Sequence, residues 1–420
     1  MVSARRIDAG ELELGGGLDV LLQSTLAGTP PGRTVEVRTP SRATALELPA
    51  WARLEGHEVL DGERPGRSNG DGSPFVVRLR RGATSRVLAA ELPPRAQPPP
   101  LRHGGELHMA DVRGGRPPPP RVRAEDGFIP LGAVAEAAAP RFDWRLNERD
   151  RVWSPDVAEL AEQATAEQWD ASRDVPWEAA REVPEALERA VAQVMTFIAQ
   201  NEYAALYVPA AFVAELNPAY VEVLSWLASH VADEARHVEV FTKRALIGGF
   251  SGYALASTEL SLRTLLDERD FSAAALLLNV LGEGTFLDLL RFVERHAPDA
   301  ATAAAARLAH RDERRHVHFG VSHVRHVLAN DPERRVALVA GVEQRASRLT
   351  ELSGLSPLLT EGLTIMAAGS LRPAALSEGA REVRALLSAM ERNRVRRLRA
   401  AGFDAATARH LSELHTPNLM

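Results

Sequence analysis

Two short segments of this chain repeat one arrangement of side chains that can bind metal ions. Glu234 precedes His237 by three residues, and Glu313 precedes His316 by the same spacing. On an α-helix this spacing places a carboxylate and an imidazole on one face, one turn apart. A single Glu-x-x-His pair is commonly an accident of a charged helix, but two copies predict a shared metal site.

Each Glu-x-x-His pair has a lone glutamate upstream of it. Glu202 precedes the first pair, and Glu283 precedes the second. Four carboxylates and two imidazoles that converge inside a helical bundle form a di-metal site. The candidate metal ligands, which are also the candidate catalytic residues, are Glu202, Glu234, His237, Glu283, Glu313 and His316.

Both upstream glutamates lie in apolar sequence. Glu202 is the only charged residue in 196–206, and residues 275–282 before Glu283 carry no charge. An unpaired carboxylate is costly to bury, so burial here requires a cation or a bound proton. This context favours metal binding over a solvated helix face.

We expect the ligands to divide into two sets. Glu202, Glu234 and His237 would mainly hold one ion, and the other three ligands would hold the second. Glu234 and Glu313 are the natural bridging carboxylates. His230, four residues before Glu234 on the same helix face, is a candidate seventh ligand, and a histidine that only packs beside the site is the alternative.

The residues next to the ligands suggest supporting roles. We expect Asp233 and Asp312 each to accept a hydrogen bond from the ligand imidazole of the other pair, which would fix its tautomer. We expect Arg236 and Arg315 to neutralise these aspartates, with ordinary surface arginines as the alternative. Among the other histidines, His310 is a weaker candidate ligand.

Residues one turn from the ligands predict a substrate pocket. Such residues would exclude water from reactive intermediates. For any one of them, packing in the core is the alternative. The expected lining is Ile198, Leu206, Phe241, Asn279 and Phe286.

Four long helices must carry these residues, and proline and glycine mark their ends. Glu202 lies 15 residues before Asn217, and Glu234 lies 16 residues after Pro218. Two antiparallel helices joined there hold both glutamates roughly 22–24 Å from the turn, at 1.5 Å per residue. The second pair repeats this spacing around Pro298. The predicted helices span residues 184–216, 219–246, 271–296 and 299–329.

A further predicted helix, residues 253–266, lies between the two hairpins. It lets the chain cross back along the bundle, which gives a ferritin-like arrangement with one long crossover. The expected fold class is therefore mainly α, with a ferritin-like helical domain and a C-terminal helical extension over 128–420. Residues 1–85 predict a small two-layer α/β domain of the βαβαββ type, and 86–127 a Pro/Gly-rich linker.

Composition limits the chemistry that is open to the chain. The 420 residues include no cysteine, which excludes disulfides, iron–sulfur clusters and thiol catalysis. Histidine and carboxylate ligands favour iron or manganese. The net charge of -6 gives no reason to expect nucleic acid or a membrane as partner, and no span or signal peptide is expected. We expect a cytoplasmic protein.

Over residues 140–330 the repeated Asp-Glu-x-Arg-His motif, with its two upstream glutamates, resembles the ferritin-like di-iron carboxylate proteins. It is most similar to the group that holds the ribonucleotide reductase small subunit, the bacterial multicomponent monooxygenases and the arylamine N-oxygenases. The resemblance implies the six ligands named above. Phe241 stands where radical-forming subunits commonly have tyrosine, so a tyrosyl radical is not expected. N-oxygenases carry an extra histidine where this chain has Ala309, whereas His230 lies in the first half.

Residues 11–82 resemble the bacterial sulfur-carrier (TusA-like) fold. The matching segments are 31–37, 48–51, 55–60 and 75–81. The cysteine motif of that family should fall near 15–18, where this chain reads Gly-Gly-Gly-Leu. The resemblance therefore implies a retained fold that docks or packs without transferring sulfur.

These observations predict a non-haem di-iron oxygenase or oxidase. It would activate O2 at two iron ions, with Mn/Fe as an alternative, and hydroxylate, N-oxygenate or desaturate a small organic substrate. Its electrons would come from an external reductase or ferredoxin, and it could form a homodimer. The alternatives are a ferroxidase or iron-handling protein, and a scaffold without catalysis.

Overall fold

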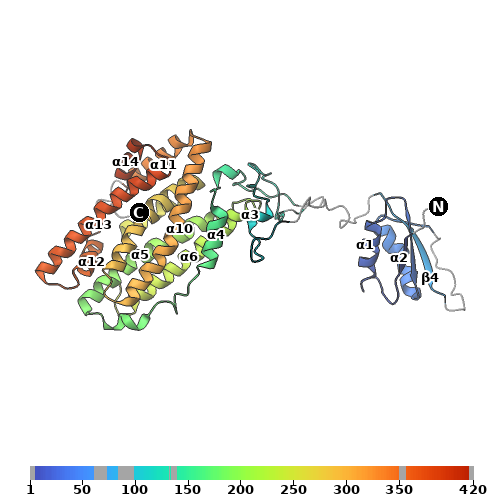
Figure 1. Ribbon diagram of the computed structural model, residues 1–420, viewed down its shortest axis with the longest axis horizontal. Coiled ribbons are helices and arrows are strands. Elements are labelled where there is room, and N and C mark those ends of the chain that lie inside the picture. Colours follow the sequence, from blue (N-terminus) through green and yellow to red (C-terminus); the bar gives the residue numbers. More distant parts are fainter. Residues whose placement is uncertain are drawn as a thin grey trace. The chain divides into compact units, whose positions relative to one another are not determined.

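The computed structural model describes residues 5–60, 73–83, 99–131, 133, 140–349 and 356–415. The chain separates into two compact units, Met1–Pro98 and Pro99–Met420. The first unit contains a small sheet, and the second is built from long helices (Figure 1).

The first unit has the element order βαβαββ. Its strands form one sheet in the order β1-β2-β4-β3, with β1 and β2 parallel and the other neighbours antiparallel. Alternate residues of β2, such as Val35 and Val37, are fully buried against the helices. The elements are β1 (Arg5–Asp8), α1 (Leu18–Ala27), β2 (Thr34–Thr39), α2 (Arg42–Leu54), β3 (Glu58–Val59) and β4 (Phe75–Arg80).

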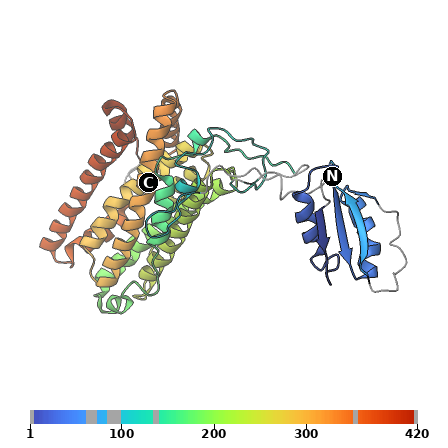
Figure 2. The ribbon, with the colours of Figure 1, turned by 45° about the vertical axis from the view of Figure 1, so that its right-hand side comes forward.

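The second unit is helical, and its long helices run side by side (Figure 2). The prediction of a mainly helical protein is therefore confirmed. The elements before the first ligand helix are α3 (Met109–Val112), η2 (Arg149–Arg151), α4 (Val157–Ala166) and η3 (Trp177–Glu182). The elements that follow are α5 (Glu185–Val213), α6 (Val221–Leu246), α7 (Ala256–Leu266), α8 (Phe271–Ala275), η4 (Leu276–Glu283), α9 (Gly284–Arg295), α10 (Ala300–Asn330), α11 (Arg334–Arg348), α12 (Pro357–Ala368), α13 (Pro373–Ala400) and α14 (Ala405–Glu413).

Two helix pairs form the body of this unit. α5 packs along α6, and α9 with η4 packs along α10. Side chains at the helix starts set these boundaries, because Asp270 and Asp299 each accept a hydrogen bond from a backbone N–H of the first turn. The observed ends agree with the predicted ones to within a few residues.

The third predicted helix is not a regular α-helix. Its middle section, η4 (Leu276–Glu283), is a π-helix that ends at the candidate ligand Glu283. Such insertions are rare and frequently occur at functional sites. The apolar sequence of this segment does not predict the change from an α-helix to a π-helix.

A buried ion network ties three helices together at one end of the bundle. Arg244 on α6 is fully buried and donates to Glu188 on α5 at 2.6 Å. Its other terminal nitrogen donates to Asp299, the capping residue of α10, at 2.8 Å. Removal of Arg244 would leave two buried carboxylates without their cation, and loss of a buried partner of this kind typically costs about 3–5 kcal/mol.

Part of the predicted linker packs on the helical unit instead. Residues from Pro99 onward belong to the second unit, and Arg113 donates to Glu222 at the start of α6, where both side chains are nearly inaccessible. The proline content predicted a flexible linker, but this ion pair holds the segment against α6.

The last helices cover the bundle. α12 packs on α5, and α13 packs on α9 and η4. Phe271–Arg295 is long and apolar enough to cross a membrane, contrary to our expectation that no segment would be, but 89% of its most apolar window is buried inside the protein. Its hydropathy is that of a helix in the core.

Candidate metal centre

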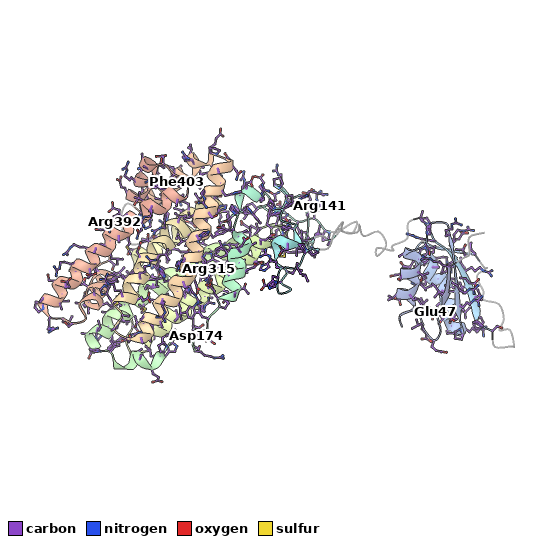
Figure 3. The ribbon with its side chains drawn as sticks, in the orientation of Figure 1. Glu47, Arg141, Asp174, Arg315, Arg392 and Phe403 are labelled. Carbon is purple, nitrogen blue, oxygen red and sulfur yellow. The ribbon has the colours of Figure 1, made fainter. Side chains whose placement is uncertain are left out.

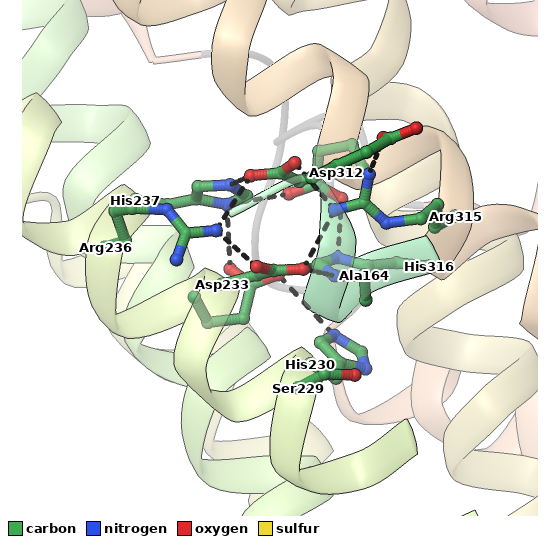
Figure 4. Close-up of polar contacts among 12 residues, drawn as sticks. Ala164, Ser229, His230, Asp233, Arg236, His237, Asp312, Arg315 and His316 are labelled. Atoms are coloured by element: carbon green, nitrogen blue, oxygen red, sulfur yellow. Dashed lines mark hydrogen bonds and ion pairs between the residues drawn. The ribbon is translucent and has the colours of Figure 1, made fainter. Parts of the chain in front are cut away.

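The structure brings all six candidate ligands together inside the helical unit. They form two groups whose donor atoms lie within 4.8 Å of one another, and Glu234 belongs to both. All of these side chains are buried, and Figure 4 shows the polar contacts that surround them. The first group is Glu202, Glu234, His237 and Glu313, and the second is His230, Glu234, Glu283 and His316.

Glu234 and Glu313 each face both ligand histidines. The two oxygens of Glu234 lie 3.3 Å from His237 Nδ1 and 2.9 Å from His316 Nδ1. The two oxygens of Glu313 lie 3.4 Å and 3.5 Å from the same two nitrogens. Each carboxylate therefore has one oxygen directed at each half of the site, which is the geometry that a bridging ligand requires.

Asp233 and Asp312 lie beside the histidines, each of which is paired with the aspartate of the other helix. His237 Nε2 is 3.3 Å from Asp312 Oδ2, and His316 Nε2 is 3.4 Å from Asp233 Oδ2. An imidazole that donates through Nε2 keeps the lone pair of Nδ1 for a metal ion. Both Nδ1 atoms face the carboxylates.

Two arginines hold these aspartates in place. Arg236 donates to Asp233 and, at 3.1 Å, to Asp312. Arg315 donates to Asp312 at 2.7 Å and to Asp233 at 3.2 Å. Arg315 is 4% exposed, and Figure 3 labels it on the helical unit. The two arginines and the two aspartates form one crossed network. The arginines are therefore not surface arginines.

Sequence reasoning missed Trp169 and Gln168, which complete this network. The Trp169 indole donates to Asp312 at 2.6 Å, and its ring stacks near His237 and lies under the Arg236 guanidinium. Gln168 donates to Asp233 at 3.1 Å. Both residues lie in the connection after α4, far from the motifs in sequence, so no local spacing pointed to them.

His230 joins the second group, although it precedes the first motif in sequence. Its Nε2 lies 3.1 Å from Glu283 and 3.5 Å from Glu234, and its ring stacks on His316 with 3.8 Å between centroids. Asn279 donates to the other Glu283 oxygen at 2.7 Å. His310, the weaker candidate, contacts Arg291 instead.

The site carries more negative charge than its imidazoles can neutralise. Burial and the charges of Glu234 and Glu313 raise the pKa of Glu202 well above its usual value. Burial disfavours charge on His237, but Glu234 and Asp312 outweigh it and hold the pKa of His237 well above the usual value. Divalent cations would relieve this imbalance.

The unpaired polar atoms match the donors of a metal site. Buried polar groups in proteins nearly always have hydrogen-bond partners. Among the described residues, the candidate-ligand atoms without a partner are both oxygens of Glu234 and Glu313, Glu202 Oε1, and Nδ1 of His237 and His316. These nitrogen and oxygen donors suit iron or manganese, so the residues present fit a di-metal centre.

A small apolar cavity reaches the second group. The volume of this cavity is about 20 Å³, which admits little more than one water molecule. Only Asn279 of the predicted pocket residues lines it; Ile198, Phe241 and Phe286 pack in the core, and Leu206 is half-buried. The cavity lining is Val208, Pro209, Phe212, Leu227, His230, Phe271, Ala274, Ala275, Leu278, Asn279 and Phe319.

The π-helical segment lies unusually close to α10. A Cβ built on Gly320 would stand 2.4 Å from the Asn279 Cβ and 3.3 Å from the Ala275 carbonyl oxygen. Glycine at this position therefore permits the close approach that places Asn279 against Glu283. The single-letter sequence gave no sign of this contact.

The sequence matches no protein-family profile and no curated protein. Among solved structures, the chain is similar to a variant of an R2-like ligand-binding oxidase with an anaerobically reconstituted Mn/Fe cofactor. The TM-score is 0.45 at 14% identity, with 59% of this chain and 93% of that chain covered. A second variant, with an aerobically reconstituted Fe/Fe cofactor, has a TM-score of 0.43 at 15% identity, with the same coverage. These two structures do not support the sulfur-carrier resemblance of the first unit.

Proposed function

We propose that this protein is a non-haem di-iron oxidase or oxygenase that uses O2 to oxidise a small organic substrate. The observation that carries the proposal is the pair of carboxylates, Glu234 and Glu313, with one oxygen directed at each ligand histidine. Two iron ions, or one manganese and one iron, are the expected occupants. Bound there, they would supply electrons for the reduction of O2.

The residues of the chain have distinct tasks in this proposal. Glu202 and His237 would hold one ion, and Glu283, His316 and His230 the other. Asp233 and Asp312 keep Nδ1 of each histidine available by accepting the Nε2 proton. Burial of the whole set excludes bulk water from the reaction.

The cavity next to His230 is suited to O2. It is apolar except for His230 and Asn279, and a small apolar molecule enters such a space without losing hydrogen bonds to water. A larger substrate requires its walls to move, and Phe212 and Phe271, which contact each other edge to face, are among them. Electrons for repeated turnover would come from an external reductase or ferredoxin.

Oxygen consumption tests the proposal. The iron-loaded protein with a chemical reductant and candidate substrates should consume O2 and form an oxidised organic product, with hydroxylation, N-oxygenation and desaturation told apart by mass. Glu313→Gln should abolish product formation. Stoichiometric oxidation of Fe(II) without any organic product would contradict it.

One observation favours a second function, that of a ferroxidase. The small volume of the cavity leaves room for O2 but none for an organic molecule in this conformation. A ferroxidase would consume O2 in proportion to added Fe(II), and organic substrates would leave its rate unchanged.

For the first unit we propose a docking role. Its βαβαββ order agrees with the resemblance to sulfur carriers, but the start of α1 at Leu18 follows glycines where the carrier family has cysteine. Without a thiol this unit transfers no sulfur. A pull-down with the isolated unit as bait would test whether it binds a partner such as the electron donor.

A further inference from the structure

A second cluster of buried polar groups lies between α9, α13 and the end of α14. Arg394 on α13 donates to Ser412 at 3.0 Å and to Thr285 on α9 at 3.5 Å. His415 Nε2 lies 3.4 Å from the same threonine hydroxyl. Arg397, one turn further along α13, donates to the Val280 carbonyl oxygen at 3.3 Å. We call Arg394, Arg397, His415, Thr285 and Ser412 the cationic cluster.

The cationic cluster holds more positive charge than its carboxylates balance. Within the described ranges, Asp288 is the acid that ion-pairs with it, 3.6 Å from Arg397. Arg394 is 9% exposed and donates to hydroxyl groups, while the exposed Glu391 acts on it through charge alone. Burial lowers the pKa of both Arg394 and Arg397 to about 10, so both remain charged at neutral pH.

Within the part of the chain that the structure describes, two nitrogen atoms of the cluster have no partner. Arg397 Nη2 and His415 Nδ1 are both buried without a hydrogen bond, and His415 is 8% exposed. Burial and the nearby guanidinium groups lower the pKa of His415 well below its usual value, so the imidazole is neutral. Its one proton lies on Nε2, because the Thr285 hydroxyl that Nε2 faces donates its own proton to the Leu281 carbonyl oxygen at 2.7 Å. Unpaired buried charges cost several kcal/mol unless a counter-charge is present.

We propose that the cationic cluster binds a small oxyanion, such as phosphate or a carboxylate. Two guanidinium groups and the Ser412 hydroxyl supply the kind of donors that such anions prefer. The anion would supply the missing negative charge and accept from Arg397 Nη2, which has no described partner. This site is separate from the metal centre and does not depend on the proposed oxidase function.

The position of the cationic cluster lets anion binding affect the metal centre through the packing between them. Thr285 follows the ligand Glu283 by two residues, and the Arg397 side chain packs so closely on Gly284 that a Cβ there would meet it at 2.4 Å. An anion that holds the Arg397 side chain in one conformation would therefore stabilise the end of the π-helix. Phosphate and metal binding are expected to be mutually favourable.

Equilibrium dialysis of the purified full chain against radiolabelled inorganic phosphate tests the proposal directly. We expect saturable binding of about one phosphate per chain, and a Tm that rises with phosphate beyond the effect of sodium chloride at equal ionic strength. Acetate and sulfate in parallel distinguish a carboxylate site from a tetrahedral-oxyanion site. Absence of saturable binding of all three anions would overturn the proposal.

Matched arginine variants of α13 locate the site. Arg394→Gln should weaken phosphate binding about tenfold or more, whereas Arg392→Gln, an exposed position on the same helix (Figure 3), should leave it unchanged. In phosphate-free buffer Arg394→Gln should not lower the Tm, because it removes an unbalanced charge. A lower Tm with unchanged phosphate binding would show a purely structural arginine and overturn the assignment.

Discussion

His237 on α6 directs its Nε2 at Asp312 on α10, with 3.3 Å between the two atoms. Its other nitrogen, Nδ1, lies 3.3 Å from Glu234 and 3.4 Å from Glu313. The imidazole thus connects an aspartate of the opposite helix to both bridging carboxylates. His316 repeats the relationship with Asp233, so each half of the centre is oriented by the other half.

Asp312→Asn should weaken metal binding about 10- to 100-fold. Replacement of the carboxylate removes the acceptor that fixes the His237 tautomer, and changes of this kind typically have that effect. Competition with a chromogenic chelator measures the affinity. Asp331→Asn, an exposed substitution at the end of α10, is the control, and equal affinities for the two variants would contradict this role.

Asn279→Leu should weaken one of the two metal-binding steps and spare the other. The amide donates to Glu283, which belongs to only one of the two ligand groups, and loss of a partner from a buried charged group costs about 1–3 kcal/mol. A stepwise Fe(II) titration separates the two steps. Asn330→Leu, at the exposed end of α10, should titrate like the unmodified protein, and equal weakening of both steps in Asn279→Leu would refute the assignment.

Gly320→Ala should destabilise the protein by about 1–3 kcal/mol, because the added methyl forces η4 away from α10. Urea unfolding gives the free energy. Gly341→Ala is the matched control, since nothing lies near that position on α11, and it should stabilise by about 0.5–1 kcal/mol through helix propensity. Equal free energies of unfolding for the two variants would show that the packing at Gly320 has room for a methyl group.

His323 should make the stability depend on pH between about 6.5 and 4. Burial lowers its pKa from 6.5 to about 4, while Nδ1 donates to the Trp153 carbonyl oxygen. The unfolded chain binds this proton first, so stability is fully present above pH 6.5 and is lost as the pH falls, by up to about 3 kcal/mol.

Comparison of variants isolates this contribution from that of other titrating groups. His323→Asn should flatten the difference in unfolding free energy between pH 7 and pH 4.5, measured by urea denaturation. His103→Asn, at an exposed position, should keep the slope of the unmodified protein. An unchanged slope in His323→Asn would show that the pKa of this histidine is the same in the folded and the unfolded chain.

The ligand helices were predictable because their signals are local. Proline, asparagine and glycine mark the helix ends, and the distances of Glu202 and Glu234 from Asn217 and Pro218 placed them at one height. That shared height is a consequence of a fixed rise per residue. The bridging roles of Glu234 and Glu313 and the pairing of each aspartate with the other histidine were expected from the place of each residue in the repeated motif.

The remaining features depend on contacts that sequence spacing does not encode. Trp169 reaches Asp312 from a separate connection, and His230 faces Glu283 on another helix as well as Glu234 of its own motif. The π-helix packs closely against Gly320. Of the predicted pocket residues Asn279 lines the cavity, because one-turn offsets select side chains of the core as readily as those of a cavity.

Metal analysis of the purified protein tests the central claim most directly. After anaerobic loading with Fe(II) and removal of free ions, elemental analysis should find two metal ions per chain. Glu234→Ala should lose both, since this carboxylate belongs to both ligand groups, whereas Glu239→Ala, an exposed acid on the same helix, should retain two. No bound metal in the unmodified protein, or equal metal content in the two variants, would contradict a di-metal centre.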